Sequence, residues 1–203
     1  MMFDKLVIAT GNFGKYKEFD EIIKSSSKDF ADEIIFAPEI SKLTVEETGK
    51  SYSENAMLKA RTWAKQSGLP CLADDSGLEV EALDGAPGLY SSRIVMGKDC
   101  DKVSWLLSNL KGIENRKARF AASVALCVPD EYILICEGFC YGKIAEAPEG
   151  SNGFGYDPVF IPEGYEKTFA KLNPDIKNSI SHRTNAFRKI SNLLLRQKEH
   201  THS

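Results

Sequence analysis

Two adjacent aspartates interrupt a stretch of this chain that otherwise has the pattern of strands. Asp74 and Asp75 belong to the pentapeptide Ala73–Gly77, which follows a short apolar run and precedes an alternating one. Aspartate is a poor strand former, glycine loosens the backbone, and neighbouring like charges repel. We therefore expect a strand to end here. The pentapeptide is then either an acidic turn or a site that uses its carboxylates, whose natural partner is a divalent cation.

The composition narrows the class of protein. The chain has 203 residues, a net charge of −3 and an ordinary apolar fraction, which suit one large domain or two small lobes. No basic field suggests a nucleic-acid partner, and no apolar run suggests a membrane partner or a secretory signal. Five cysteines without a C-x-x-C pair favour reduced thiols. We expect a cytoplasmic protein.

Periodicity predicts an α/β fold with a mixed sheet. Strand patterns cover 5–9 and 33–37, and a hairpin pattern joins 118–128 to 132–143. A helix after residue 15 would bury Phe19, Ile22 and Ile23, and Ser51 with Glu54 forms a capping box for a helix over 51–66. Further helices are expected over 99–110, 174–179 and 184–197, with a long loop over 146–165.

The turn Thr10–Lys15 joins the first strand to the first helix. Two glycines permit close approach, the helix N-terminus presents amides, and Lys15 adds a positive charge, so the turn has the chemistry of a phosphate cradle. Its glycine spacing is not that of a Walker motif, and a plain strand-to-helix connection is the alternative.

A second carboxylate cluster precedes the 51–66 helix. Glu46 and Glu47 lie in a polar connection, and Asn55 and Lys59 share one face of the helix. Mg²⁺ commonly binds one or two carboxylates together with substrate phosphates. Glu46 or Glu47 with one of the two aspartates would meet that requirement, whereas a solvated helix face is the alternative for Lys59.

Two later segments carry polar and aromatic candidates. In Gly153–Pro158, glycines flank Phe154 and leave its ring free to stack on a base, although a loop aromatic can also be a packed anchor. Lys177 and the tripeptide Ser181–Arg183 gather hydrogen-bond donors at a junction of two helices, where they either serve a site or cap helices in solvent.

Taken in order, these motifs resemble the Ham1-like family of inosine and xanthosine triphosphate pyrophosphatases. The matching motifs run from about residue 5 to residue 195: T-G-N-x-G-K at 10–15, E-E-T-G at 46–49, E-N-A-x-x-K-A at 54–60, A-D-D-S-G-L at 73–78, G-A-P-G-x-Y-S-x-R at 85–93, G-x-G-Y-D-P at 153–158 and S-H-R at 181–183.

The resemblance implies an activity and an architecture. The activity is hydrolysis of ITP, dITP and XTP to the monophosphate and pyrophosphate, with Mg²⁺ as cofactor and Mn²⁺ as a possible substitute. The role is removal of deaminated purines from the nucleotide pool. The architecture is a single domain over residues 1–203, with a long mixed β-sheet, flanking helices and two lobes around a central cleft. The resemblance also implies a homodimer.

The resemblance further assigns roles to residues. Asp75 becomes the general base and a metal ligand, together with Glu46 or Glu47. Phe154 stacks on the purine, Asp157 and the Tyr156 backbone meet its edge, and donors reach its 6-keto oxygen. The substrate-binding set is Thr10, Gly11, Asn12, Phe13, Gly14, Lys15, Lys59, Ser76, Phe154, Gly155, Tyr156, Asp157, Lys177, His182 and Arg183. Because neighbours on a strand face opposite sides, Asp74 is expected to support Asp75 rather than chelate with it, unless the strand has already ended there.

Two rival interpretations are weaker. A Maf-like nucleotide pyrophosphatase shares the expected fold and reaction but lacks the S-H-R and G-Y-D-P motifs found here. A non-catalytic nucleotide or nucleic-acid binding module would have to tolerate surplus carboxylates and an acidic net charge, which repel phosphate when no metal is present.

Overall fold

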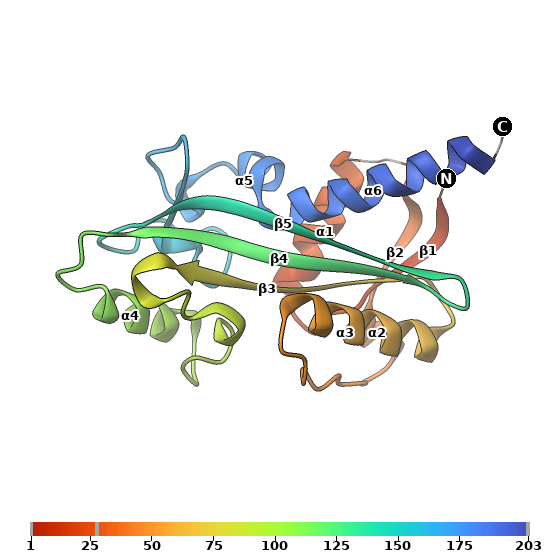
Figure 1. Ribbon diagram of the computed structural model, residues 1–203, viewed down its shortest axis with the longest axis horizontal. Coiled ribbons are helices and arrows are strands. Elements are labelled where there is room, and N and C mark those ends of the chain that lie inside the picture. The colour runs from red at the N-terminus through yellow and green to blue at the C-terminus, as the bar shows by residue number, and fades with distance from the viewer. Residues whose placement is uncertain (1, 27–28, 202–203) are drawn as a thin grey trace. The chain divides into compact units, whose positions relative to one another are not determined.

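The computed structural model describes residues 2–26 and 29–201 and has a six-stranded mixed sheet with flanking helices (Figure 1). The strand order is β2-β1-β3-β4-β5-β6. The strands are β1 (Phe3–Ile8), β2 (Ala31–Phe36), β3 (Cys71–Val80), β4 (Lys117–Val128), β5 (Tyr132–Ile144) and β6 (Phe160–Pro162). The helices are α1 (Phe13–Ser26), α2 (Ala37–Ile40), α3 (Tyr52–Ser67), α4 (Asp99–Asn109), α5 (Pro174–Ile180) and α6 (His182–Thr201). The α/β class and the mixed sheet are confirmed.

The chain divides into two compact units. The first contains Met1–Asp75, Ala122–Gly138 and Arg183–Ser203, and the second contains Ser76–Ala121 and Phe139–His182. Each unit has a core of its own, described below. The expectation of a single domain with two lobes stays a prediction.

In the first unit, strand periodicity divides the core into two layers. Leu6 and Ile8 of β1 pack with α1 and α6, whereas Val7 and Ala9 pack with α2 and α3. Figure 1 shows α1 and α6 on one side of β1 and β2, and α2 and α3 on the other. Both faces of β1 are therefore buried over residues 6–8, as the apolar run of this parallel strand requires.

Helix α3 begins and ends where its sequence predicts. The Ser51 side chain accepts a hydrogen bond from the Glu54 amide, and Gly68 ends the helix in the left-handed region. The Glu54 carboxylate bonds the amide of Lys50 at 2.7 Å, one residue before the amide of a standard capping box. The cap fixes the start of the helix that carries Asn55 and Lys59.

The predicted strand end at the acidic pentapeptide is wrong. Residues 73–77 lie inside β3, which continues for ten residues from Cys71 to Val80. The strand tolerates the aspartates because both have strong polar partners, described below. Alternation holds through the pentapeptide: Leu72 packs in the α1 and α6 layer, and Ala73 packs in the α3 layer. Asp74 therefore faces α1 and α6, and Asp75 faces α3.

The second unit is organised around aromatic residues. Phe120 lies against Phe160, Phe169 and the ring of His182, with centroid distances of 4.6, 6.1 and 4.8 Å. Helix α4 contributes Val103 and Leu106 to the same core. The long loop predicted over 146–165 contains strand β6, which the sequence analysis missed because it is only three residues long.

Two further expectations concern the chain as a whole. All five cysteines are free thiols, as expected. Across residues 2–26 and 29–201, no helix combines the length and the apolar character that crossing a membrane requires.

Candidate functional site

Asp74 is the anchor of a buried ionic network in the first unit. One of its carboxylate oxygens accepts a 3.0 Å hydrogen bond from Arg183 Nε, and the other lies 3.1 Å from Lys15 Nζ. Arg183 also donates through Nη1 to Glu18 Oε2 at 3.0 Å. Asp74, Glu18 and Arg183 are each at most 5% exposed at the side chain. The network joins α1, β3 and α6.

The charges of this network set the protonation of Asp74. Burial alone would raise the pKa of its carboxyl, but Lys15 and Arg183 outweigh that effect and hold the pKa far below the ordinary value. Burial and the Arg183 charge lower the pKa of Lys15. Asp74 is thus an ionised structural anion at neutral pH, which suits the supporting role expected for it.

Asp75 has a different environment on the opposite face of β3. Its Oδ2 accepts a 2.9 Å hydrogen bond from Asn55 Nδ2, and Lys59 Nζ lies 3.8 Å from Oδ1. Its side chain keeps 10% of its accessible surface. Burial, with a contribution from the Glu47 charge, raises the pKa of Asp75 despite the opposing effects of Lys59 and Asn55. A raised pKa makes this carboxylate a stronger base than an ordinary aspartate.

Asn55 connects Asp75 to the segment before α3 that carries Glu46 and Glu47. While Nδ2 donates to Asp75, Oδ1 accepts from the Gly49 amide at 2.8 Å. A Cβ on Gly49 would come within 2.6 Å of Asn55 Oδ1, so this close approach requires glycine. The E-E-T-G and E-N-A motifs therefore meet at one fully buried amide.

Glu47, rather than Glu46, points toward Asp75. Glu47 Oε1 lies 2.7 Å from Lys59 Nζ, whereas Glu46 is exposed to solvent. Among the residues that the structure describes, no group of three or more His, Cys, Asp and Glu side chains forms a complete metal cage. Glu47 and Asp75 both lie near the Lys59 ammonium, so a cation is favourable between them. Two carboxylates suit Mg²⁺, which fills its remaining coordination positions with water and substrate phosphates.

The turn before α1 has its own internal hydrogen bonds. Thr10 Oγ1 accepts from the Asn12 amide at 3.1 Å, and Asn12 Oδ1 accepts from the Lys15 amide at 3.2 Å, so Asn12 caps α1. A Cβ on Gly11 would meet nothing within 4 Å. Packing therefore does not require glycine there, and the turn is open to a ligand. Phe13 is 59% exposed and packs edge-on against Phe36.

A third group lies in the second unit. Lys177 Nζ donates to Asp157 Oδ2 at 2.6 Å and lies 5.1 Å from the centre of the Phe154 ring. The same Asp157 oxygen accepts from the Phe154 amide at 2.9 Å. Gly153 has φ +77°, and a side chain there would collide with Asp157. Phe154 is half-buried, so both the packed and the stacking interpretations remain compatible with its position.

The S-H-R tripeptide is buried rather than solvated. His182 is 3% exposed and its ring stacks on Phe120 at an interplanar angle of 12°. Ser181 ends α5 with its amide bonded to the carbonyl of Lys177. Arg183 bonds Asp74 and Glu18, so these contacts place it in the ionic network of the first unit, whereas Lys177 bonds Asp157.

Three further residues predicted for the site are Tyr156, Ser76 and Gly155. Tyr156 is buried and its hydroxyl donates to the carbonyl of Ser91 at 3.1 Å. Ser76 follows Asp75 in β3 and is half-buried. Gly155 has φ +64° and its amide donates to the Asp99 carboxylate.

Sequence reasoning missed Glu18 and Asp99 as site-supporting residues. A signal existed for Glu18: it lies beside Phe19, Ile22 and Ile23 on a helix whose apolar face is buried, and a carboxylate there needs a cation. For Asp99 no local signal existed, because its partner Gly155 is 56 positions away in the sequence.

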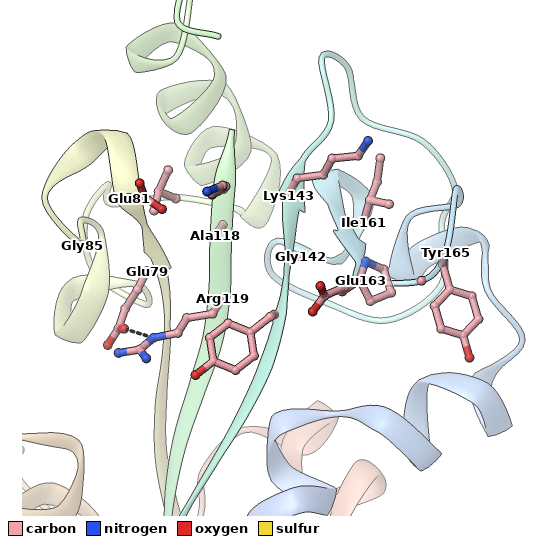
Figure 2. A pocket seen from close by; sticks show the side chains of 15 residues that line it. Glu79, Glu81, Gly85, Ala118, Arg119, Gly142, Lys143, Ile161, Glu163 and Tyr165 are labelled. Atoms are coloured by element: carbon pink, nitrogen blue, oxygen red, sulfur yellow. Dashed lines mark hydrogen bonds and ion pairs between the residues drawn. The ribbon is translucent and has the colours of Figure 1, made fainter. Parts of the chain in front are cut away.

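A separate groove of about 700 Å³ lies in the second unit (Figure 2). Its lining includes Lys117, Lys143, Tyr165 and the Glu79–Arg119 ion pair, whose N–O distance is 2.7 Å. Figure 2 shows that pair across β3 and β4. None of the residues predicted for the site lines this groove.

Removing the guanidinium from the ionic network should destabilise the protein. Arg183→Ala leaves two buried carboxylates without their shared cation, so we expect a loss of about 3–5 kcal/mol in the free energy of unfolding, measured with urea. Arg196→Ala, an exposed arginine of the same helix, should change it by less than about 0.5 kcal/mol. Equal losses in the two variants would show that the network does not stabilise the fold.

The raised pKa of Asp75 predicts that replacing this residue stabilises the protein at neutral pH, in contrast to the loss expected for Arg183→Ala. A carboxyl whose folded-state pKa is raised stabilises the fold when protonated, and this contribution is lost as pH rises through that pKa. Asp75→Asn should therefore raise the melting temperature at pH 7 by about 2–4 °C, and the gain should shrink as the pH falls toward the unfolded-state pKa of about 3.9.

The control is Asp4→Asn, which changes an exposed aspartate in β1. It should show neither the gain nor its pH dependence. A drop in melting temperature for Asp75→Asn at pH 7 would contradict the conclusion that burial penalises the ionised Asp75 carboxylate.

Comparison with known proteins identifies the family. The model of the Ham1 family matches residues 6–193. The dITP/XTP pyrophosphatase of Aquifex aeolicus is 44% identical over 201 residues, covering 94% of this chain and 96% of that protein. The enzyme of the same name from Bacillus subtilis is 44% identical over 200 residues, covering 96% and 98%. A solved HAM1 protein from Coxiella burnetii has a TM-score of 0.81 and 40% identity, covering 95% of this chain and 98% of that one. This chain belongs to the Ham1 family.

Proposed function

We propose that this protein hydrolyses the non-canonical purine triphosphates ITP, dITP and XTP to the monophosphate and pyrophosphate. Membership of the Ham1 family and similarity to proteins named dITP/XTP pyrophosphatase support this activity. The observation that carries the proposal is Asp75: a buried carboxylate with a raised pKa, oriented by Asn55 and bordered by Lys59 and Glu47.

Asp75 acts as the general base. It takes a proton from a water molecule, whose oxygen attacks the α-phosphorus as the bond from that phosphorus to the bridging oxygen breaks. Pyrophosphate leaves with the electron pair of that bond. The Asn55 amide holds one oxygen of the carboxylate in place, which orients the base toward the water.

Glu47 and Asp75 would hold Mg²⁺, with Mn²⁺ as a possible substitute. When bound, the cation neutralises charge on the triphosphate as the leaving group forms. Glu46 is the less suitable ligand because its side chain is exposed, whereas Glu47 already binds the Lys59 ammonium. Lys59 adds a second positive charge for the phosphates.

The turn Thr10–Lys15 would bind the phosphates. Its support is the capped N-terminus of α1 and the open space at Gly11, which lets an anion approach the backbone. Lys15 contributes charge from its position beside Asp74. Ser76, next to the base in β3, would contact substrate.

Residues of the second unit would recognise the purine. Phe154 stacks on the ring, while Asp157 and the Tyr156 backbone meet its edge. Lys177, His182 and Arg183 are the donors that the resemblance assigns to a 6-keto oxygen. Adenine presents an amino donor at that position, so buried donors would be left unpaired, which can reject a substrate by roughly 10⁴. The homodimer and the cytoplasmic location implied by the resemblance stay predictions.

A substrate panel tests the activity. Phosphate release should be measured with added inorganic pyrophosphatase on ITP, XTP, ATP and GTP. We expect kcat/KM for ITP and XTP to exceed that for ATP and GTP by at least about 10², and Asp75→Asn to lower kcat by about 10²–10⁴ while ITP binding persists. Equal rates on ITP and ATP, or a fully active Asp75→Asn variant, would refute the proposal.

Metal removal tests the carboxylate pair. EDTA should abolish turnover and added Mg²⁺ should restore it. Glu47→Gln should raise the Mg²⁺ concentration needed for half-maximal activity by about tenfold or more, because a ligand is lost. The matched variant Glu46→Gln should change it less than about twofold. A larger effect at Glu46 would assign the ligand to the other glutamate, and activity in EDTA would remove the metal from the mechanism.

A further inference from the structure

The loop that carries Phe154 has little rigidity of its own. Gly153 and Gly155 flank the ring, and both adopt positive φ, at +77° and +64°. Two glycines give such a segment many accessible conformations, so holding one of them requires bonds from elsewhere. Three side-chain hydrogen bonds contribute to this restraint, beside the bond from the Asp157 amide to the Phe154 carbonyl and the Lys177 ammonium over the Phe154 ring.

Two of the contacts involve residues within the predicted motif. Asp157 Oδ2 accepts from the Phe154 amide at 2.9 Å, which closes the loop on itself. The Tyr156 hydroxyl donates to the Ser91 carbonyl at 3.1 Å, which fixes the residue two positions after Phe154. The carbonyl of the peptide between Phe154 and Gly155 accepts a 3.3 Å hydrogen bond from the Asp157 amide, so the third side-chain contact acts on the N–H of that peptide.

The third contact comes from the first residue of α4. The Gly155 amide donates to Asp99 Oδ2 at 2.7 Å, and Asp99 Oδ1 bonds Lys102 Nζ at 3.0 Å. Partial burial would raise the pKa of Asp99, but the Gly155 amide and Lys102 lower it overall, which keeps the carboxylate ionised. A charged acceptor makes a shorter and stronger bond than a neutral one.

We propose that Asp99 is a positioning residue for purine binding. Its carboxylate ties the peptide next to Phe154 to α4, which is fixed in the core by Val103 and Leu106. Lys102 keeps the carboxylate in place from the next turn of the helix. This role rests on the proposed function, because it assumes that Phe154 stacks on the base. A binding ring that is held in place before the nucleotide arrives loses less entropy on binding.

The test compares three variants by two measurements. Asp99→Ala removes the acceptor, Asp99→Asn keeps an acceptor oxygen without the charge, and Asp101→Ala removes a different first-turn carboxylate of α4, which bonds the Lys98 amide. One measurement is steady-state hydrolysis of ITP. The other is hydrogen exchange of the Gly155 amide in the enzyme without nucleotide, which reports the loop whatever the substrate is.

For Asp99→Ala we expect the Gly155 amide to exchange roughly tenfold faster, since a charge-assisted bond is lost at a side chain that is 47% exposed. The KM for ITP should rise about three- to tenfold with kcat within about twofold of wild type, because stacking contributes equally to ground-state and transition-state binding. Asp99→Asn should recover most of both effects, and Asp101→Ala should leave both near wild type.

Other results would overturn the proposal in distinguishable ways. Unchanged exchange at Gly155 in Asp99→Ala would show that Asp99 does not hold the loop. Faster exchange with an unchanged KM would show that the loop position does not matter for binding. An Asp101→Ala variant that matched Asp99→Ala would assign the effect to the end of α4 instead. Absence of ITP hydrolysis in wild type would refute the proposed function and the positioning role for purine binding that rests on it, while the exchange data would still report whether Asp99 holds the loop.

Discussion

The alternation of side chains along β3 determines how the acidic residues of this protein can be used. Asp74 and Asp75 are neighbours in sequence, yet the strand directs one toward α1 and α6 and the other toward α3. Each face then supplies its own partners. Two cations surround Asp74, whereas an amide, an ammonium and a second carboxylate surround Asp75. Opposite pKa shifts follow from this separation.

The two faces of β3 also have different roles: the face with Asp74 stabilises the fold, and the face with Asp75 carries the carboxylate proposed as the base. The network of Lys15, Asp74, Arg183 and Glu18 ties two helices to the strand and holds its carboxylates ionised. Asp75 lies in the same strand, so the network also holds its backbone in place. Its desolvated carboxylate opposes folding at neutral pH, which is a common property of groups that a protein keeps for reactivity.

The sequence predicted the parts of the fold that depend on local chemistry. Capping residues and periodicity located α3 almost to the residue, and the apolar face of α1 was identified from Phe19, Ile22 and Ile23. The strand end at Ala73–Gly77 was wrong because local propensity disfavours two aspartates in a strand, and only tertiary partners such as Arg183, 109 positions away, reverse that preference. The choice between Glu46 and Glu47 and the restraint of Gly155 by Asp99 depend equally on distant contacts.

In this structure, one strand gives its two neighbouring aspartates opposite protonation behaviour. This behaviour is tested most directly by NMR titration of the side-chain carboxyl carbons in protein labelled with ¹³C-aspartate, with Asp75→Asn used to assign the resonance of Asp75. We predict that Asp75 takes up its proton at a pH above the ordinary aspartate value of about 3.9, while Asp74 remains ionised at that pH and below it. Titration of both carboxyls together near that value, or protonation of Asp74 before Asp75, would contradict the account.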